Sequence, residues 1–155
     1  MHKIPILDDI GFFGPFILIF YAIIMLTCRV PYIIIYTLFM LVSSCLNRCL
    51  KRTIRQPRPS KTGIMYSEFE SVTGTEQYGM PSGHSQSVAF STAFIYLVTK
   101  SIYSLMGCSF VSCITFYQRY KYKRHSISQI IMGALTGIGV ASLAYYFIFR
   151  YLSYS

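Results

Sequence analysis

Residues 78–86 read Tyr-Gly-Met-Pro-Ser-Gly-His-Ser-Gln and lie where a polar segment passes into a long apolar run. Pro81 suits a position at or beside a helix start, and Ser82 can cap the first backbone N–H groups of that helix. Gly83 allows a ligand to approach the backbone closely, and His84 can carry a proton near neutral pH. Such a helix start predicts an anion site, with phosphate as the natural ligand. Taken alone, the stretch is equally compatible with an ordinary capped helix.

The composition predicts a membrane protein that forms one domain over residues 1–155. Of its 155 residues, 54% are hydrophobic and only 12% are charged, which is unlike a soluble globular domain. Lys and Arg number 14 against 5 Asp and Glu, so the net charge is +9, and the basic residues fall between the apolar runs. This distribution suits anionic head groups or anionic substrates and, without a long basic arm, argues against nucleic acid as a partner.

Five apolar runs predict an all-α bundle of about five transmembrane helices. The spans cover about residues 11–28, 32–50, 83–99, 102–117 and 130–149, with polar loops at 51–82 and 118–129. The first run can be a cleaved signal peptide or an uncleaved span, and the absence of an A-x-A site favours the span. Gly133, Gly137 and Gly139 predict close helix packing. The five cysteines lie in or beside apolar runs, so we expect them to be buried.

Five crossings bring three polar stretches to one membrane face. These stretches are the end of the second run, the start of the third, and the loop before the fifth. That face also carries 11 of the 14 Lys and Arg residues. By the positive-inside tendency, this charge bias predicts a cytoplasmic orientation of the face.

The first polar stretch places two cations near each other. Lys51 lies on the last turns of a helix that Pro57 ends, and the chain can then bend so that Arg58, held between prolines, lies beside Lys51. Lysine supplies a compact charge, and arginine a fork that matches phosphate oxygens. A basic collar that snorkels below a membrane span is the alternative interpretation.

The third polar stretch leads from Arg119 through His125 to Gln129. If the last helix has begun, Gln129 lies one helical turn after His125. One ring nitrogen of His125 can then attack phosphorus while Gln129 accepts a hydrogen bond from the other. A basic interfacial loop with tyrosine anchors is again the alternative.

Together, the three stretches resemble the signatures of the type 2 phosphatidic acid phosphatase superfamily in order and spacing. Those signatures run K-x6-R-P, P-S-G-H and R-x5-H-x3-D, and they stand here at Lys51–Pro59, Pro81–His84 and Arg119–Gln129. The surroundings of the second signature, together with Gln129 where most members have Asp, look like the dolichyl diphosphatase branch. The resemblance covers about residues 47–135. It implies the helical core shared with haloperoxidases, which commonly has six membrane helices where we count five.

The resemblance also implies a role for each motif residue. His125 would attack the terminal phosphorus to form a phosphohistidine, and His84 would protonate the leaving oxygen. The phosphate oxygens would be held by Lys51, Arg58, Arg119 and the backbone at Ser82 and Gly83. Since phosphoryl transfer depends mostly on positioning and charge stabilisation, this set can act without a metal or other cofactor. All five carboxylates lie outside the motifs.

We therefore expect a metal-independent phosphatase that converts a polyprenyl diphosphate, such as dolichyl diphosphate, to the monophosphate and phosphate. The alternatives are a phosphatidate or other lipid monophosphate phosphatase, and a non-catalytic protein that binds anionic lipid. Lipid substrate and membrane lipids are the expected partners, and no oligomeric state follows from the sequence. The resemblance implies the endoplasmic reticulum membrane with a lumenal site, against the cytoplasmic orientation that the charge bias predicts.

Gln129 is the main departure from the superfamily pattern. A neutral amide can orient His125, but it cannot stabilise an imidazolium as a carboxylate does, so we expect slower chemistry. On this view Gln129→Asp should retain or raise activity.

Overall fold

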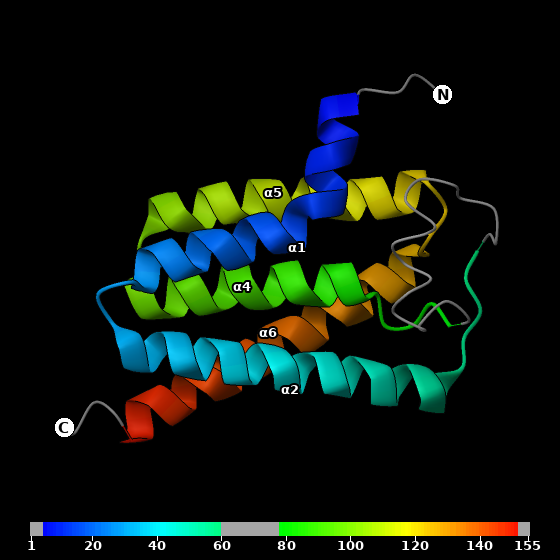
Figure 1. The fold of residues 1–155 in the computed structure, drawn as a ribbon. Helices are drawn as coiled ribbons and strands as arrows, with labels where there is room; N and C mark the ends of the chain where they lie inside the picture. Colours follow the sequence, from blue (N-terminus) through cyan, green and yellow to red (C-terminus); the bar gives the residue numbers. More distant parts are fainter. Residues whose placement is uncertain (1–4, 60–77, 152–155) are drawn as a thin grey trace.

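The computed structural model describes residues 5–59 and 78–151, and these residues form five α-helices (Figure 1). In chain order the helices are α1 (Pro5–Leu26), α2 (Val30–Ile54), α4 (Gly83–Thr99), α5 (Ile102–Lys121) and α6 (Ile127–Tyr151). Elsewhere the described residues contain one isolated bridge, between Pro57 and Tyr78, and no longer strand. The predicted all-α fold is confirmed. Residues 60–77 of the predicted loop 51–82 lie outside the described residues.

Local signals end α4 and begin the next helix within a tight reversal. Lys100 adopts a left-handed conformation with φ 54°, and its N–H donates to the carbonyl of Tyr96. Ser101 then caps α5, because its hydroxyl oxygen accepts a hydrogen bond from the Ser104 N–H at 3.3 Å. The two helices are therefore antiparallel neighbours, as the short polar break between their apolar runs predicts.

The first helix begins earlier than hydropathy predicts. It starts at Pro5 rather than near residue 11, so the polar residues Asp8 and Asp9 lie within it. Asp8 is only 2% exposed and forms an ion pair with Lys121 of α5. A buried carboxylate is tolerated when it is paired in this way. The predicted boundary was wrong because hydropathy does not reveal a partner that is distant in sequence.

Helix α4 lies at the centre of the bundle and contacts each of the other four helices (Figure 1). Its most buried large side chains include Phe90 and Phe94, which stack on each other and contact the ring of Tyr36 on α2. The Tyr36 hydroxyl is hydrogen-bonded to the Ser91 hydroxyl at 2.8 Å. Because α4 begins with the Pro-Ser-Gly-His turn, this central packing fixes the position of that turn.

Two glycines of α6 allow it to lie directly against α4. A Cβ added at Gly137 would overlap the carbonyl oxygen of Gln86, and one added at Gly133 would lie 2.5 Å from the carbonyl oxygen of Ser82. The prediction of close packing is confirmed for these two residues. It is wrong for Gly139, where an added Cβ would meet no atom within 4 Å because that face of α6 points outward.

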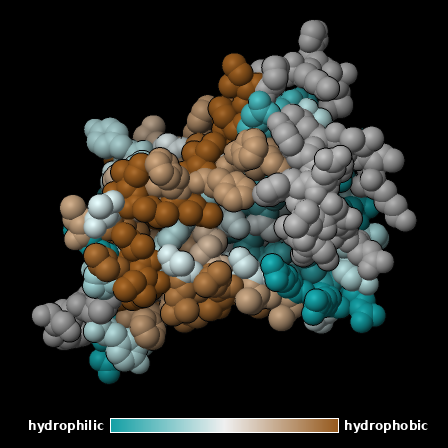
Figure 2. All heavy atoms as spheres, viewed as in Figure 1, coloured by the Kyte–Doolittle hydropathy of each residue, from teal (hydrophilic) through white to brown (hydrophobic). Residues whose placement is uncertain are grey.

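The outer surface of the bundle is largely apolar. Figure 2 shows hydrophobic residues over much of the visible helix surface and hydrophilic residues gathered near the end of α2. Large side chains such as Phe20, Leu38 and Phe110 are more than half exposed. Among the described residues, three stretches are long and apolar enough to cross a membrane: Ile6–Leu26, Val30–Ile54 and Ile127–Tyr151. These features fit an integral membrane protein.

Considered alone, neither α4 nor α5 is a typical membrane span. Helix α4 has only 17 residues, and α5 carries polar side chains that face inward. Of these, Ser104 is hydrogen-bonded to Tyr21 at 3.0 Å, and Ser112 to Thr92 at 2.9 Å. Hydroxyl groups that bond between helices are common inside membrane bundles. The inward polar residues therefore account for the low hydropathy of α5.

The prediction that all five cysteines are buried is wrong. Cys108 is buried in the core, whereas Cys28, Cys45, Cys49 and Cys113 are exposed. Cys45, Cys49 and Cys113 lie on outward faces of their helices, where lipid accepts an apolar side chain as readily as the core does, and Cys28 lies in the turn between α1 and α2. Hydropathy alone cannot distinguish these two environments.

We expect Gly137→Ala to destabilise the protein by about 1–3 kcal/mol, because the added methyl group would overlap the main chain of α4. The thermal midpoint of unfolding in detergent measures this effect. Gly139→Ala is the matched control, since its methyl group would enter open space. Equal midpoints for the two variants would show that α4 and α6 do not pack this closely.

Candidate active site

Three polar stretches that are distant in sequence meet at one end of the bundle, where α2 and α5 end and α4 and α6 begin (Figure 1). Main-chain hydrogen bonds join the stretches directly. The Gly79 N–H donates to the carbonyl of Gln56 at 2.8 Å, and the Ser82 N–H donates to the carbonyl of Gln129 at 3.0 Å. The convergence predicted from five crossings is therefore present.

The imidazole of His125 is held in one tautomer. Its Nδ1 atom lies 2.9 Å from the carbonyl oxygen of Gly79 and 3.3 Å from Oε1 of Gln129. Both partners are acceptors, so Nδ1 carries the proton and the lone pair is on Nε2. The side chain is buried, with 3% exposure. An Nε2 lone pair in a fixed orientation is what a nucleophilic histidine requires.

Gln129 connects His125 to the first polar stretch. Its Oε1 accepts a hydrogen bond from the Ser126 N–H at 3.2 Å, and its Nε2 donates to the carbonyl of Pro57 at 2.9 Å and to Oε1 of Gln56 at 3.1 Å. The two main-chain partners, one donor and one acceptor, fix the orientation of the amide. Gln129 therefore lies beside His125 as predicted and also positions residues 56–57.

Nothing in the sequence indicates that a main-chain carbonyl makes the shorter bond to His125. That carbonyl belongs to Gly79, at which an added Cβ would overlap the amide of Gln129. Only a residue without a side chain can occupy this position while Gln129 remains in place. The glycine just before the Pro-Ser-Gly-His turn is the one hint in the sequence of a close contact there, but a glycine does not show which residue the contact involves.

The positive charges of the three predicted cations act on the His125 imidazole. The pKa of His125 is lowered from 6.5 to about 3, first by burial and then by the positive charges of Arg58, Lys51 and Arg119. Lys51 and Arg119 are themselves 6% and 1% exposed. Three buried or half-buried cations beside one neutral imidazole form a site suited to a multiply charged anion.

The second histidine contacts one of these cations. Nε2 of His84 lies 2.6 Å from Nη2 of Arg119. A guanidinium only donates, so Nε2 accepts and the His84 ring is neutral in this arrangement. Arg119 thus lies near both histidines, which brings His84 and His125 to the same side of the bundle.

The start of α4 differs in one detail from the expected phosphate cradle. The Ser82 hydroxyl caps the helix by accepting from the Ser85 N–H at 3.4 Å, and the Ser82 N–H is engaged with Gln129. The Ser82 N–H is therefore engaged within the protein, and the next N–H groups, beginning at Gly83, remain the candidates for the predicted phosphate contact.

A buried polar network holds the Pro-Ser-Gly-His turn against α2. Nδ2 of Asn47 donates to Oε1 of Gln86 at 2.7 Å and to the carbonyl of Pro81 at 3.3 Å. Nε2 of Gln86 in turn donates to the carbonyl and the hydroxyl of Ser43, at 2.7 and 2.8 Å. Sequence analysis missed this network, because a single polar residue inside a span does not identify its partner.

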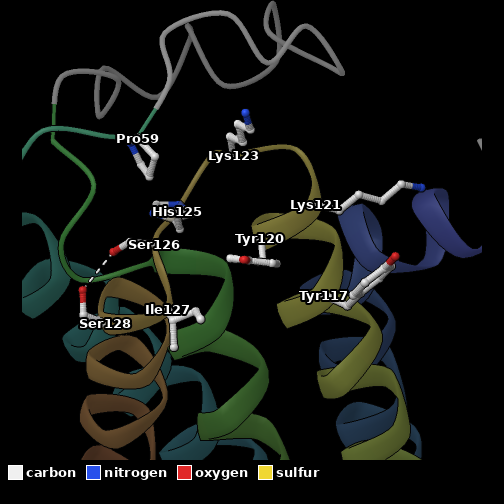
Figure 3. Close-up of a pocket in the computed structure, with 9 residues that line it drawn as sticks. All are labelled: Pro59, Tyr117, Tyr120, Lys121, Lys123, His125, Ser126, Ile127 and Ser128. Carbon is white, nitrogen blue, oxygen red and sulfur yellow. Dashed lines mark hydrogen bonds between the residues drawn. The ribbon is translucent and has the colours of Figure 1, made fainter. Parts of the chain in front are cut away.

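A cavity of about 740 Å³ opens beside His125, between the end of α5 and the start of α6 (Figure 3). It is lined by Pro59, Tyr117, Tyr120, Lys121, Lys123, His125, Ser126, Ile127 and Ser128. Tyr117, Tyr120 and Ile127 are each more than half exposed on the bundle surface. The cavity therefore connects His125 to an apolar surface.

Within residues 5–59 and 78–151, no three His, Cys, Asp or Glu side chains are grouped as metal ligands would be. Whether the protein acts without a metal stays a prediction.

The chain is similar to a known family and to two curated relatives. The PAP2 superfamily model matches residues 32–152. Dolichyldiphosphatase of Saccharomyces cerevisiae is 33% identical over 119 residues, which are 70% of this chain and 48% of that protein. Lipid phosphate phosphatase epsilon 2, chloroplastic, of Arabidopsis thaliana is 30% identical over 111 residues, which are 66% of this chain and 35% of that protein. The chain thus spans less than half the length of either relative.

A solved structure has the same fold. It is the crystal structure of a transmembrane PAP2-type phosphatidylglycerolphosphate phosphatase from Bacillus subtilis, with a TM-score of 0.73. The similarity covers 96% of this chain and 80% of that chain at 16% sequence identity. At this identity the similarity concerns the fold alone.

Burial of neutral His125 predicts that stability depends on pH. The pKa of His125 is lower in the folded protein than the ordinary value of 6.5, so protonation favours the unfolded chain. The contribution of the neutral ring to the free energy of unfolding is therefore complete above about pH 6.5 and is lost as the pH falls toward 3. We expect the thermal midpoint, measured in detergent without phosphate, to fall between pH 7 and 4.5. His125→Asn keeps a donor near the Gly79 carbonyl but does not titrate, so its midpoint should fall less. Parallel curves for the two proteins would contradict this account.

Gln129→Asp should affect stability and activity differently. The shorter carboxylate cannot donate to Pro57 and Gln56, and a lost buried bond of this kind costs about 1–3 kcal/mol. Turnover should persist, because the Gly79 carbonyl still orients the imidazole. The control is Gln129→Asn, which is equally short but keeps the amide donor and should melt at a higher temperature than the Asp variant. Complete loss of turnover in a folded Asp variant would contradict the predicted role of this residue.

Proposed function

Because the chain belongs to the PAP2 superfamily, we propose that it is a metal-independent lipid phosphatase that hydrolyses a polyprenyl diphosphate, of the dolichyl type, to the monophosphate and phosphate. The observation that supports this most directly is the buried, neutral His125 among the charges of Lys51, Arg58 and Arg119. Cations that bind the oxygens of a phosphate would hold its phosphorus within reach of a neutral imidazole.

In the proposed first step, Nε2 of His125 attacks the terminal phosphorus and the bond from that phosphorus to the bridging oxygen breaks. The Nδ1 proton remains hydrogen-bonded to the Gly79 carbonyl, so the ring keeps its orientation while it gains positive charge. The three cations and the N–H groups at the start of α4 stabilise the equatorial oxygens. The product of this step is a phosphohistidine at His125.

His84 is the proposed acid and then base. Its Nε2 accepts from Arg119 in this structure, and a bound phosphate that attracts Arg119 would leave Nε2 able to take up a proton from water. His84 would give that proton to the leaving oxygen. Water would then attack the phosphohistidine and break the phosphorus–nitrogen bond while His84 accepts a proton from the water. Release of phosphate would leave His125 neutral, and His84 would lose its proton to water as Arg119 returns to Nε2.

One observation favours a lipid as the substrate, and a second favours a diphosphate. The cavity beside His125 is continuous with an apolar surface that suits a hydrocarbon chain. One relative is named a dolichyldiphosphatase, and it is 33% identical over most of this chain. The endoplasmic reticulum membrane, with a lumenal site, is the location that this branch of the superfamily implies.

A lipid monophosphate is the second candidate substrate. Another relative is named a lipid phosphate phosphatase, and the histidines and cations described here need only one phosphoryl group. A catalytically silent protein that binds anionic lipid through the same basic end is the third possibility.

Phosphate release by detergent-purified protein, from polyprenyl diphosphate and from phosphatidate with a chelator present, tests the proposal. We expect faster release from the diphosphate and a loss of at least about a thousandfold in His125→Ala, since removing a nucleophile leaves little covalent catalysis. Tyr103→Ala, which alters an 84% exposed residue near the start of α5, is the control and should retain activity.

The phosphohistidine makes a second readout available. After a short reaction with diphosphate labelled on the terminal phosphorus, wild-type protein should carry an acid-labile, alkali-stable label that His125→Ala lacks. Equal phosphate release by wild type and His125→Ala would discard both enzyme hypotheses and leave the lipid-binding one.

A further inference from the structure

Helix α1 contributes a side chain to the site although it lies outside the residues that match the family model. The side chain is Phe12, which is only 1% exposed. Its ring centroid lies 5.1 Å from Cζ of Arg119 and 5.6 Å from the ring of His84. One aromatic ring therefore contacts both members of the Arg119–His84 hydrogen bond.

The backbone of α1 approaches α5 closely on both sides of Phe12. A Cβ added at Gly11 would lie 2.5 Å from Cβ of Gln118, and one added at Gly14 would overlap Oγ1 of Thr115. The spacing of these two glycines places them on the face of α1 that meets the end of α5. This close approach fixes the depth at which the Phe12 ring enters the site.

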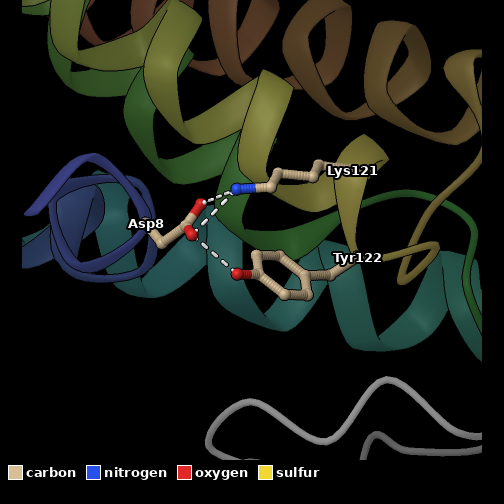
Figure 4. A network of polar contacts seen from close by, with 3 residues as sticks. All are labelled: Asp8, Lys121 and Tyr122. Carbon is tan, nitrogen blue, oxygen red and sulfur yellow. Dashed lines mark hydrogen bonds and ion pairs between the residues drawn. The ribbon is translucent and has the colours of Figure 1, made fainter. Parts of the chain in front are cut away.

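An ion pair one turn earlier fixes the orientation of the same segment (Figure 4). The Asp8 carboxylate accepts two hydrogen bonds from Nζ of Lys121, both at 2.8 Å, and one from the Tyr122 hydroxyl at 2.7 Å. Helix α1 bends in Figure 1, and Pro15 within it accounts for the bend because it removes a helical hydrogen bond. The first turns of α1 are thereby directed across the end of α5 that carries Arg119.

An aromatic ring is well suited to orient a phosphate-binding arginine. The negative face of the ring attracts the guanidinium, but it neither neutralises the charge nor occupies the N–H donors as a carboxylate would. Arg119 can then stay oriented and keep its full charge for the substrate. Contact of the same ring with His84 keeps the imidazole in place when a bound phosphate attracts the N–H groups of Arg119 away from Nε2.

We propose that Phe12 is a positioning residue of the active site, which holds Arg119 and His84 in the geometry that binds phosphate and transfers a proton to the leaving group. The proposal rests on the proposed function for the step at the leaving group. Its other half, the orientation of Arg119 toward a phosphate group, can be tested without turnover.

The first test compares two identical substitutions on α1. Phe12→Leu should weaken binding of inorganic phosphate, measured from the phosphate dependence of the thermal midpoint, by about tenfold, as loss of a buried cation–π contact implies. The value of kcat for lipid hydrolysis should fall at least as much. Phe20→Leu, which alters a 66% exposed ring, should change neither by more than about twofold.

The second test separates the electrostatic role of the ring from its packing role. Phenylalanine with one, two or three ring fluorines at position 12 keeps nearly the same volume but weakens the attraction to a cation. Phosphate affinity should fall stepwise along this series. In an Arg119→Lys background the steps should shrink, because the oriented guanidinium is gone. This series also serves if Phe12→Leu does not fold.

The outcomes distinguish the two proposals. A flat fluorine series, or a Phe12→Leu protein that binds phosphate as Phe20→Leu does, would overturn the role of Phe12. A stepwise loss of phosphate affinity in a protein that hydrolyses none of the lipids would support the role of Phe12 and refute the proposed function.

Discussion

The hydrogen bond from Nδ1 of His125 to the Gly79 carbonyl is the contact on which the site depends. This bond places the lone pair on Nε2. Residue 79 must be glycine, because the Gln129 amide occupies the space where a Cβ would lie. Burial and three nearby cations keep the ring neutral. A neutral, oriented imidazole next to concentrated positive charge is chemically unusual, and it suits attack on a phosphate that brings the compensating negative charge.

The bundle maintains this arrangement through close contacts around α4. Glycines on α6 bring its main chain against that of α4, so the start of one helix lies beside the start of the other. The polar network of Asn47 and Gln86 ties the same turn to α2. Helix α1 adds Phe12 and the ion pair of Asp8 from the remaining side. Each contact joins a different helix to the same few residues, which explains why the site lies where the helix ends converge.

On the face that Figure 2 shows, polar groups gather near that end, while the rest of the visible surface is largely apolar. Inside the bundle, several hydroxyl and amide groups are hydrogen-bonded between helices, as in the pairs Tyr36–Ser91 and Thr92–Ser112, which suits polar groups that water cannot solvate. The cavity beside His125 lies at the boundary between these two regions. A lipid whose head group is anionic and whose tail is apolar matches both sides of this boundary.

The sequence alone determined that the chain is helical, that three motifs meet at one end, and which cations and histidines gather there, because apolar run lengths and motif order constrain the topology. It could not determine the start of α1, because hydropathy does not reveal the distant partner of Asp8, nor the exposure of Cys113 or the open space at Gly139, because hydropathy does not separate lipid-facing from core positions. Nor could it show that the Gly79 carbonyl orients His125, that the Ser82 N–H is engaged by Gln129, or that Phe12 contacts Arg119. Those contacts join main-chain atoms and side chains across tens of residues, so only the tertiary packing of the helices decides them.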